Sequence, residues 1–154
     1  MKKNLVLILF ALLWKISFSQ QPDAAKWTYS SEQNSNGEAT LTFKLSLAKD
    51  WHTYSQYTPD GGPLPMVFKF DPDNCYQLIG KVTEPKPLEE YDSTFEMKVL
   101  ILEKEVIFHQ KVKTTGNTCT IKGTIEYQIC KDACIFKDNS FVFNLKKKIS
   151  SSTR

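Results

Sequence analysis

The chain is dominated by an alternation of apolar and polar residues with a period of two. In residues 40–47, every second side chain is Leu or Phe, and the residues between them are Thr, Lys or Ser. Similar alternation marks four more segments, at residues 66–70, 97–101, 121–129 and 141–145. No segment of ten or more residues has the apolar stripe of a helix. The pattern therefore predicts strands with one buried and one solvated face.

Turn-forming sequences separate these segments at regular intervals. They are rich in Gly, Pro, Asn and Asp and lie at residues 34–37, 58–63, 71–74, 85–87 and 114–117. We expect seven to nine short strands, and because no helices are available to cover a parallel sheet, two antiparallel sheets should pack face to face. The predicted fold class is all-β, an immunoglobulin-like antiparallel β-sandwich. A small closed barrel is the alternative, which periodicity does not separate from a sandwich.

The first 19 residues are typical of a secretory signal peptide. Two lysines precede an apolar stretch at residues 5–14, and Ser17 and Ser19 provide the small residues of a cleavage site before Gln20. This stretch is too short to cross a membrane, which needs about 20 apolar residues. We therefore predict an exported protein, periplasmic or secreted, without membrane insertion. Residues 20–154 should form a single domain in a compartment where cysteines can pair.

The composition is that of a globular domain: the 154 residues are 41% hydrophobic, 12% aromatic and 24% charged. These values exclude a disordered, collagen-like or coiled-coil chain. The formal net charge is +3, and the three lysines of the signal peptide account for all of it. A mature chain near neutrality lacks the basic surface that nucleic-acid binding requires, so no nucleic-acid partner is expected. We expect a monomer.

The four cysteines, Cys75, Cys119, Cys130 and Cys134, allow three complete pairings. Cys130 ends a predicted strand, and Cys134 follows after three residues, before a strand expected to begin near Ser140. The two thiols should therefore face each other across the base of a tight loop. A disulfide that closes so short a loop stabilises the fold little, which favours a reducible pair. An inert hairpin clip is the other interpretation.

The remaining cysteines and the histidines give weaker signals. Cys75 and Cys119 each follow a turn, and the sequence is compatible with both a bond and two free thiols; a bond would contribute about 3 to 4 kcal/mol. The two histidines, His52 and His109, are far from the cysteines in sequence, so no metal site is expected. Motifs of serine hydrolases, zinc proteases and phosphate-binding loops are absent from the sequence, and no cofactor is expected.

Five segments resemble the N-terminal periplasmic domain of the thiol:disulfide interchange protein DsbD, particularly its stand-alone versions. They are WHTYSQ (51–56), GGPLP (61–65), GKVTEP (80–85), EEYDSTFEMKV (89–99) and IKGTIEYQIC (121–130). The resemblance covers essentially the whole mature chain. It implies an immunoglobulin-like sandwich with one redox-active cysteine pair. Such a domain relays reducing equivalents between a membrane reductase and thioredoxin-like periplasmic proteins, so the expected partners are these proteins and a separate membrane thiol reductase.

The resemblance also implies roles for individual residues. Cys134 would attack and form mixed disulfides with partners, and Cys130 would resolve them. The resemblance further implies an aromatic cap residue, two acidic neighbours and two aromatic site-lining residues: Tyr91, then Glu89 and Glu90, then His52 and Tyr54. The chain departs from the family in having three, rather than four or five, residues between the cysteines. It also lacks the Leu-Pro-Pro-like sequence that follows the second cysteine in the family.

The hairpin should make the attacking thiol a weak nucleophile by itself. No helix N-terminus lies beside the pair to stabilise a thiolate, and the nearby cations are Lys131 and Lys137. The resemblance implies that Glu89 or Glu90, if the cap places it near Cys134, is a candidate proton acceptor. The predicted function is thiol-disulfide exchange, an oxidoreductase activity. The alternative is a secreted immunoglobulin-like binding or structural module with inert disulfides.

Overall fold

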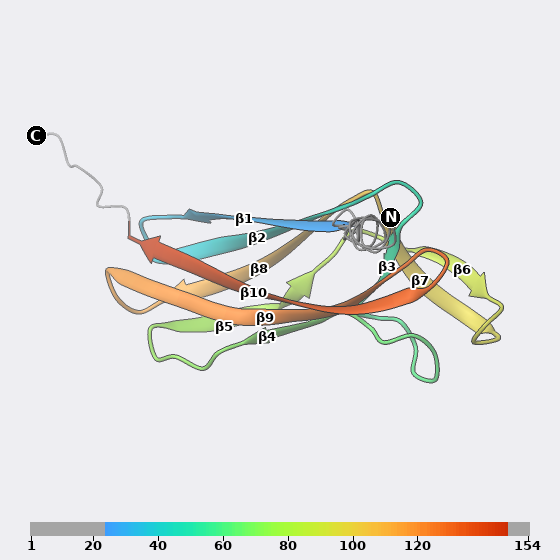
Figure 1. The fold of residues 1–154 in the computed structure, drawn as a ribbon. Helices are drawn as coiled ribbons and strands as arrows, with labels where there is room; N and C mark the ends of the chain where they lie inside the picture. The colour runs from blue at the N-terminus through green and yellow to red at the C-terminus, as the bar shows by residue number, and fades with distance from the viewer. Residues whose placement is uncertain (1–23, 148–154) are drawn as a thin grey trace, which may run out of the picture.

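The computed structural model describes residues 24–147, which form strands, turns and loops. The strands are β1 (Ala25–Gln33), β2 (Glu38–Leu47), β3 (His52–Tyr54), β4 (Val67–Phe70), β5 (Tyr76–Thr83), β6 (Leu88–Asp92), β7 (Met97–Glu103), β8 (Glu105–Thr114), β9 (Thr118–Cys130) and β10 (Cys134–Lys146). One sheet has the order β1-β2-β8-β5. The other has the order β10-β9-β3-β7-β6, with β4 also paired to β9. Figure 1 shows β1 and β2 stacked over β9 and β10.

The predicted all-β, immunoglobulin-like antiparallel sandwich is confirmed, because every strand pair in the described residues is antiparallel. The two sheets share no strand in the described part of the chain, so a closed barrel is not formed. Within residues 24–147, no helix is long and apolar enough to cross a membrane. The predicted signal peptide, residues 1–19, lies outside the described residues.

The number of strands and one strand boundary differ from the prediction. The described residues form ten strands rather than seven to nine, because short segments such as β3 and β6 carry too few residues to show an alternation. We expected the last strand to begin near Ser140, but β10 begins at Cys134 and pairs with β9 along its whole length. The side chains from Cys134 to Ser140 are exposed or half-buried. Because neither face of this stretch is deeply buried, its sequence carries no alternation, and the pattern on which the prediction rested is missing.

Aromatic side chains from both sheets meet in the core between them. Phe43 of β2 is fully buried, and its ring centroid lies 5.0 Å from that of Phe141 and 5.1 Å from that of Phe143, both on β10. Phe68 of β4 lies 5.2 Å from the same ring. Large rings packed at such distances contribute both buried apolar area and favourable edge-to-face contacts. They hold the two sheets face to face.

Strand β9 is the central strand of the larger sheet, because β10, β3 and β4 all pair with it. Its odd-numbered residues, Cys119 to Ile129, point into the main core, where only Gly123 breaks the apolar series. A side chain at Gly123 would collide with the Lys69 carbonyl oxygen and the Phe141 ring. Glycine therefore lets β4 approach β9 closely at this point.

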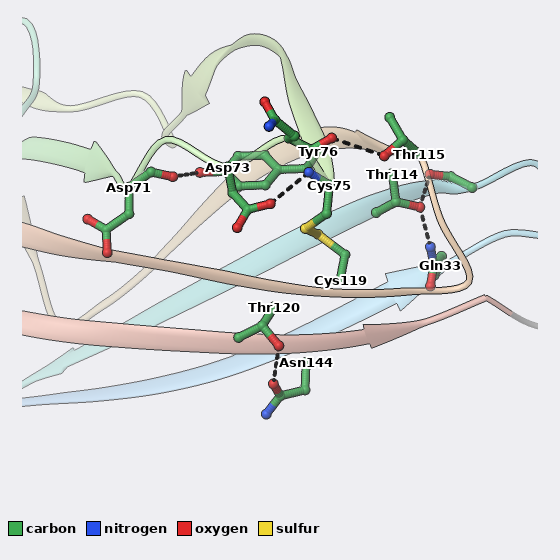
Figure 2. The surroundings of a disulfide bond; sticks show 12 residues. Gln33, Asp71, Asp73, Cys75, Tyr76, Thr114, Thr115, Cys119, Thr120 and Asn144 are labelled. Atoms are coloured by element: carbon green, nitrogen blue, oxygen red, sulfur yellow. Dashed lines mark hydrogen bonds between the residues drawn. A yellow bond between two sulfur atoms is a disulfide. The ribbon is translucent and has the colours of Figure 1, made fainter.

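The disulfide between Cys75 and Cys119 joins the two sheets at one end of the sandwich (Figure 2). Cys75 directly precedes β5, and its Cα atom lies 5.5 Å from that of Cys119 on β9. Cys119 is 4% exposed and belongs to the main core. The Asp73 carboxylate accepts a hydrogen bond from the Cys75 N–H (2.7 Å), and the Thr115 N–H donates to the Cys75 carbonyl (3.0 Å). The sequence left this pairing open, and the structure shows a bond.

We expect the Cys75–Cys119 bond to contribute most of the disulfide stabilisation. It spans 44 residues of sequence, whereas the Cys130–Cys134 bond spans 4. By the chain-entropy model, replacing both Cys75 and Cys119 by Ala lowers the free energy of unfolding by about 4 kcal/mol, against about 2 kcal/mol for Cys130 and Cys134. Guanidinium unfolding of both double variants measures the difference. Equal losses would contradict the assignment.

Candidate functional site

Cys130 and Cys134 form a disulfide across the base of the β9–β10 hairpin. The two residues are directly opposite each other in the strand register, and their Cα atoms are 4.1 Å apart. Residues 131–133 form the loop, in which the Lys131 N–H donates a hydrogen bond to the Ala133 carbonyl (3.4 Å). The pairing predicted from the short spacing is confirmed. In the described residues no cysteine is free.

The two sulfur-bearing residues differ sharply in exposure. Cys130 is only 3% exposed, whereas Cys134 is exposed. Cys130 packs with Tyr54, Val99 and Ile101 in a small apolar group, here called the outer cluster. Strand register places the outer cluster on the face of the larger sheet that points away from the main core. A reactant can therefore reach the disulfide from solvent at Cys134.

Two aromatic residues of β3, His52 and Tyr54, lie beside the disulfide. The Tyr54 hydroxyl is 3.7 Å from Cys134 Sγ, and His52 Nε2 is 3.5 Å from the same hydroxyl. His52 lies opposite Cys130 in register, and its ring meets the Tyr54 ring edge to face at 5.4 Å. Burial, with smaller effects of Asp92 and Glu90, raises the pKa of Tyr54. The phenol therefore keeps its proton and can donate a hydrogen bond to sulfur.

The structure separates the two glutamates of the predicted cap. Glu90 on β6 lies opposite Val99 of the outer cluster, and its charge acts on Tyr54. Glu89 lies on the other face of β6, where its carboxylate forms an exposed ion pair with Lys98 (2.6 Å). Of the two candidate proton acceptors, Glu90 is therefore the one on the side of the disulfide.

Tyr91 is 64% exposed and lies opposite Lys98 in register, on the face of β6 away from Glu90. It lines a shallow hollow of about 190 Å³ together with His52 and Glu90. Cys134 remains exposed in this arrangement. The role of Tyr91 as a cap stays a prediction.

The structure places more negative charge near the disulfide than we expected from the sequence. Lys131, in the hairpin loop, pairs with Asp50 (3.5 Å), which offsets its charge. Asp92 faces Tyr54 along with Glu90 and also accepts hydrogen bonds from the backbone N–H groups of Thr94 and Phe95 (2.8 and 3.2 Å). Two carboxylates near the site disfavour a thiolate there. Residues 24–147 contain no group of three side chains suited to hold a metal ion.

Sequence reasoning missed two features of the site. One is Asp92, which was not singled out. It is the last residue of the acidic EEYD motif, and that motif is the sequence signal that could have identified it. Glu84 was also missed, together with its partners Ser55 and Gln56. These three residues lie within the GKVTEP and WHTYSQ segments, but the sequence gives no sign that the two segments meet.

Comparisons with known proteins agree with this geometry. The family model described as "Thiol:disulfide interchange protein DsbD, N-terminal" matches residues 18–146. No curated protein sequence matches the chain.

Several solved structures share the fold. The N-terminal periplasmic domain of ScsB from Proteus mirabilis has a TM-score of 0.61 and 20% identity over 82% of this chain; the chain spans about half (49%) of that domain's length. The reduced DsbD N-terminal domain of Neisseria meningitidis has a TM-score of 0.51 and 17% identity, covering 78% of this chain and 84% of that one. The structure of the Neisseria meningitidis complex between the DsbD and PilB N-terminal domains has a TM-score of 0.54 and 16% identity, covering 80% and 87%.

The opposite placement of Glu89 and Glu90 gives a matched test of the local charge. With Cys130 replaced by Ser, Cys134 is the remaining free thiol while the Cys75–Cys119 bond is kept. In this background, Glu90→Gln should lower the pH midpoint of Cys134 alkylation by iodoacetamide by about 0.3 to 1 unit, because a charge that opposes the thiolate is removed. Glu89→Gln should leave the midpoint unchanged. A slower reaction in Glu90→Gln would indicate that Glu90 accepts the thiol proton instead.

Proposed function

The chain belongs to the family of the N-terminal domain of the thiol:disulfide interchange protein DsbD, and we propose that it is an exported thiol-disulfide exchange module. In this role, Cys130 and Cys134 relay reducing equivalents between a membrane thiol reductase and thioredoxin-like proteins. Residues 1–19 would serve as its signal peptide, and residues 20–154 would act as a single domain in the periplasm.

The observation that carries the proposal is the unequal exposure of the two bonded cysteines. Disulfide exchange requires a thiolate to approach one sulfur in line with the S–S bond, so access decides which sulfur is attacked. Cys134 is exposed, whereas Cys130 is 3% exposed within the outer cluster. This asymmetry favours Cys134 as the sulfur that bonds to partners and Cys130 as the sulfur that leaves and returns.

Exchange at this pair balances without a cofactor. A partner thiolate attacks Cys134 Sγ, the Cys130–Cys134 bond breaks, and Cys130 leaves with the electron pair and takes up a proton. The partner's second thiolate then attacks the partner sulfur that is bonded to Cys134. This step releases Cys134 as a thiolate, which takes up a proton. The partner ends as a disulfide, and this protein holds two thiols. The reverse sequence passes the two electrons to the next protein.

The electrostatics of the site favour reaction in its oxidised form with a low-pKa thiolate from a partner. The acidic pair Glu90 and Asp92 opposes a thiolate on Cys134, while the Tyr54 hydroxyl is placed to donate to it. Thioredoxin-like proteins have thiols of low pKa and supply the nucleophile that the hairpin lacks. The solved complex of a DsbD N-terminal domain with the PilB N-terminal domain shows that a domain of this family can bind another protein domain.

Trapping of mixed disulfides tests the two cysteine roles. The probe is a thioredoxin variant that keeps only its attacking cysteine, activated as the nitrothiobenzoate disulfide. Cys130→Ser should form the mixed disulfide at least about tenfold faster than Cys134→Ser, because the accessible sulfur remains. Equal trapping would show that the assigned roles are wrong. No trapping by either variant would favour a binding or structural module with inert disulfides.

The proposed cap role of Tyr91 has its own test. If Tyr91 shields the sulfurs, Tyr91→Ala should speed alkylation of Cys134 in the Cys130→Ser background by about threefold or more, with little change in thermal stability. Tyr57→Ala is the control, because Tyr57 is similarly exposed (56% against 64%) but lines a different groove, between β4 and β5. An unchanged rate in Tyr91→Ala would mark Tyr91 as an ordinary surface residue.

A further inference from the structure

Glu84 links the two sheets at the end of β3, the strand that carries Tyr54. It directly follows β5 of the four-stranded sheet, and its carboxylate reaches the residues that follow β3 of the other sheet. The Ser55 hydroxyl donates a hydrogen bond to Glu84 Oε1. The backbone N–H and the side-chain amide of Gln56 both donate to Glu84 Oε2, each at 3.1 Å. One half-buried carboxylate thus accepts three hydrogen bonds from two consecutive residues.

The partners of Glu84 are themselves held firmly. Ser55 is fully buried, its N–H donates to the Leu100 carbonyl (2.9 Å), and its hydroxyl oxygen accepts from the Tyr57 N–H (3.0 Å). The Gln56 amide also donates to the Val82 carbonyl (3.4 Å). Within residues 24–147, no lysine or arginine forms an ion pair with Glu84. Hydrogen bonds to a charged acceptor are roughly twice as strong as neutral ones, which suits a carboxylate to this place.

The carboxylate acts where the backbone ladder of β3 ends. Strand β3 has only three residues, and β9 pairs with its first two, His52 and Thr53. Tyr54 is paired on one side only, opposite Ile101 of β7. Its side chain packs in the outer cluster, and on the β9 side its backbone is held not by the ladder but by the residues that follow it. These are Ser55 and Gln56, the two residues that Glu84 holds.

We propose that Glu84 is a positioning residue, which fixes Ser55 and Gln56 and thereby keeps the Tyr54 hydroxyl against Cys134 Sγ. The inference deepens the proposed function, because it concerns the sulfur assigned there to attack partners. Glu84 makes no contact with the sulfur itself and exchanges no proton or electron. Tyr54 keeps its proton and donates a hydrogen bond, which becomes stronger when Cys134 is a thiolate.

The charged and titratable groups near Cys134 come from several elements. They are His52 of β3, Glu103 of β7, which lies opposite His52 in register, Glu90 and Asp92 of β6, and Asp132 and Lys131 of the hairpin loop, of which Lys131 pairs with Asp50. None of these residues is itself replaced in the Glu84 and Tyr54 variants, and the contact of His52 Nε2 with the Tyr54 hydroxyl (3.5 Å) is lost equally in Tyr54→Phe and in the double variant. A double-mutant cycle between Glu84 and Tyr54 therefore isolates the path that joins these two residues.

The experiment measures the pH dependence of Cys134 alkylation by iodoacetamide in the Cys130→Ser chain. Tyr54→Phe should raise the pH midpoint by about one unit, a tenfold lower thiolate fraction at neutral pH. Because a more basic thiolate is also more nucleophilic, the rate at pH 7 should fall by only about threefold. Glu84→Ala should raise the midpoint in the same direction. The double variant Tyr54→Phe/Glu84→Ala should show no further rise beyond Tyr54→Phe.

Two more variants keep the test decisive. Glu84→Gln retains one side-chain oxygen for Ser55 and should give a smaller shift than Glu84→Ala, so it serves if the alanine variant unfolds. Glu38→Ala removes a glutamate at the opposite end of the sandwich, which pairs with Lys113 (3.6 Å). It should leave the midpoint unchanged even where it lowers the unfolding temperature, which separates positioning from general stability.

Two results would overturn the inference. One is an unchanged midpoint in both Glu84 variants when Tyr54→Phe shifts it. The other is a double variant that shifts further than Tyr54→Phe alone, because Glu84 would then act by another route. Alkylation needs no partner protein, so this outcome is independent of the trapping experiment. A failure of trapping with the expected midpoint shifts would reject the relay and leave the role of Glu84 intact.

Discussion

The alternation of side chains along β9 is the constraint on which the rest of the structure depends. The strand has 13 residues and pairs with three other strands, so its register with them fixes the positions of most strands of the larger sheet. Its odd positions build the main core against the four-stranded sheet. Cys119 and Cys130 are separated by an odd number of positions, so they must point to opposite faces. One cysteine enters the core, and the other joins the outer cluster.

This geometry places the two disulfides of the chain in different surroundings. They lie at the two ends of β9, about 36 Å apart along the strand. The Cys75–Cys119 bond closes a long loop and has one sulfur-bearing residue in the core, where reductants have little access. The Cys130–Cys134 bond closes a short loop and leaves one member exposed. Distance and burial together allow one pair to exchange while the other remains a cross-link.

Opposing effects meet at Cys134. Two carboxylates of β6 face the Tyr54 hydroxyl, whose own pKa is raised mainly by burial, so the residue beside the sulfur is a hydrogen-bond donor. The donor favours a thiolate, and the carboxylates oppose it. A short strand, β3, carries this donor, and Glu84, which follows β5 of the other sheet, accepts hydrogen bonds from the two residues that follow β3. The reactivity of the hairpin thus depends on residues contributed by both sheets.

The sequence by itself determined the strands with one buried face, the antiparallel sandwich and the Cys130–Cys134 pairing. Alternation along a strand reports which side chains are buried, and a separation of three residues keeps two cysteines close in space, so both signals are local in the chain. The resemblance to a known family added His52 and Tyr54, which the structure places beside the disulfide. Only the tertiary structure decided that Cys75 bonds to Cys119, that Glu90 rather than Glu89 faces the site, and that Glu84 reaches Ser55. Each of these depends on the register between strands that are distant in the chain, and a one-residue change in register would reverse every face.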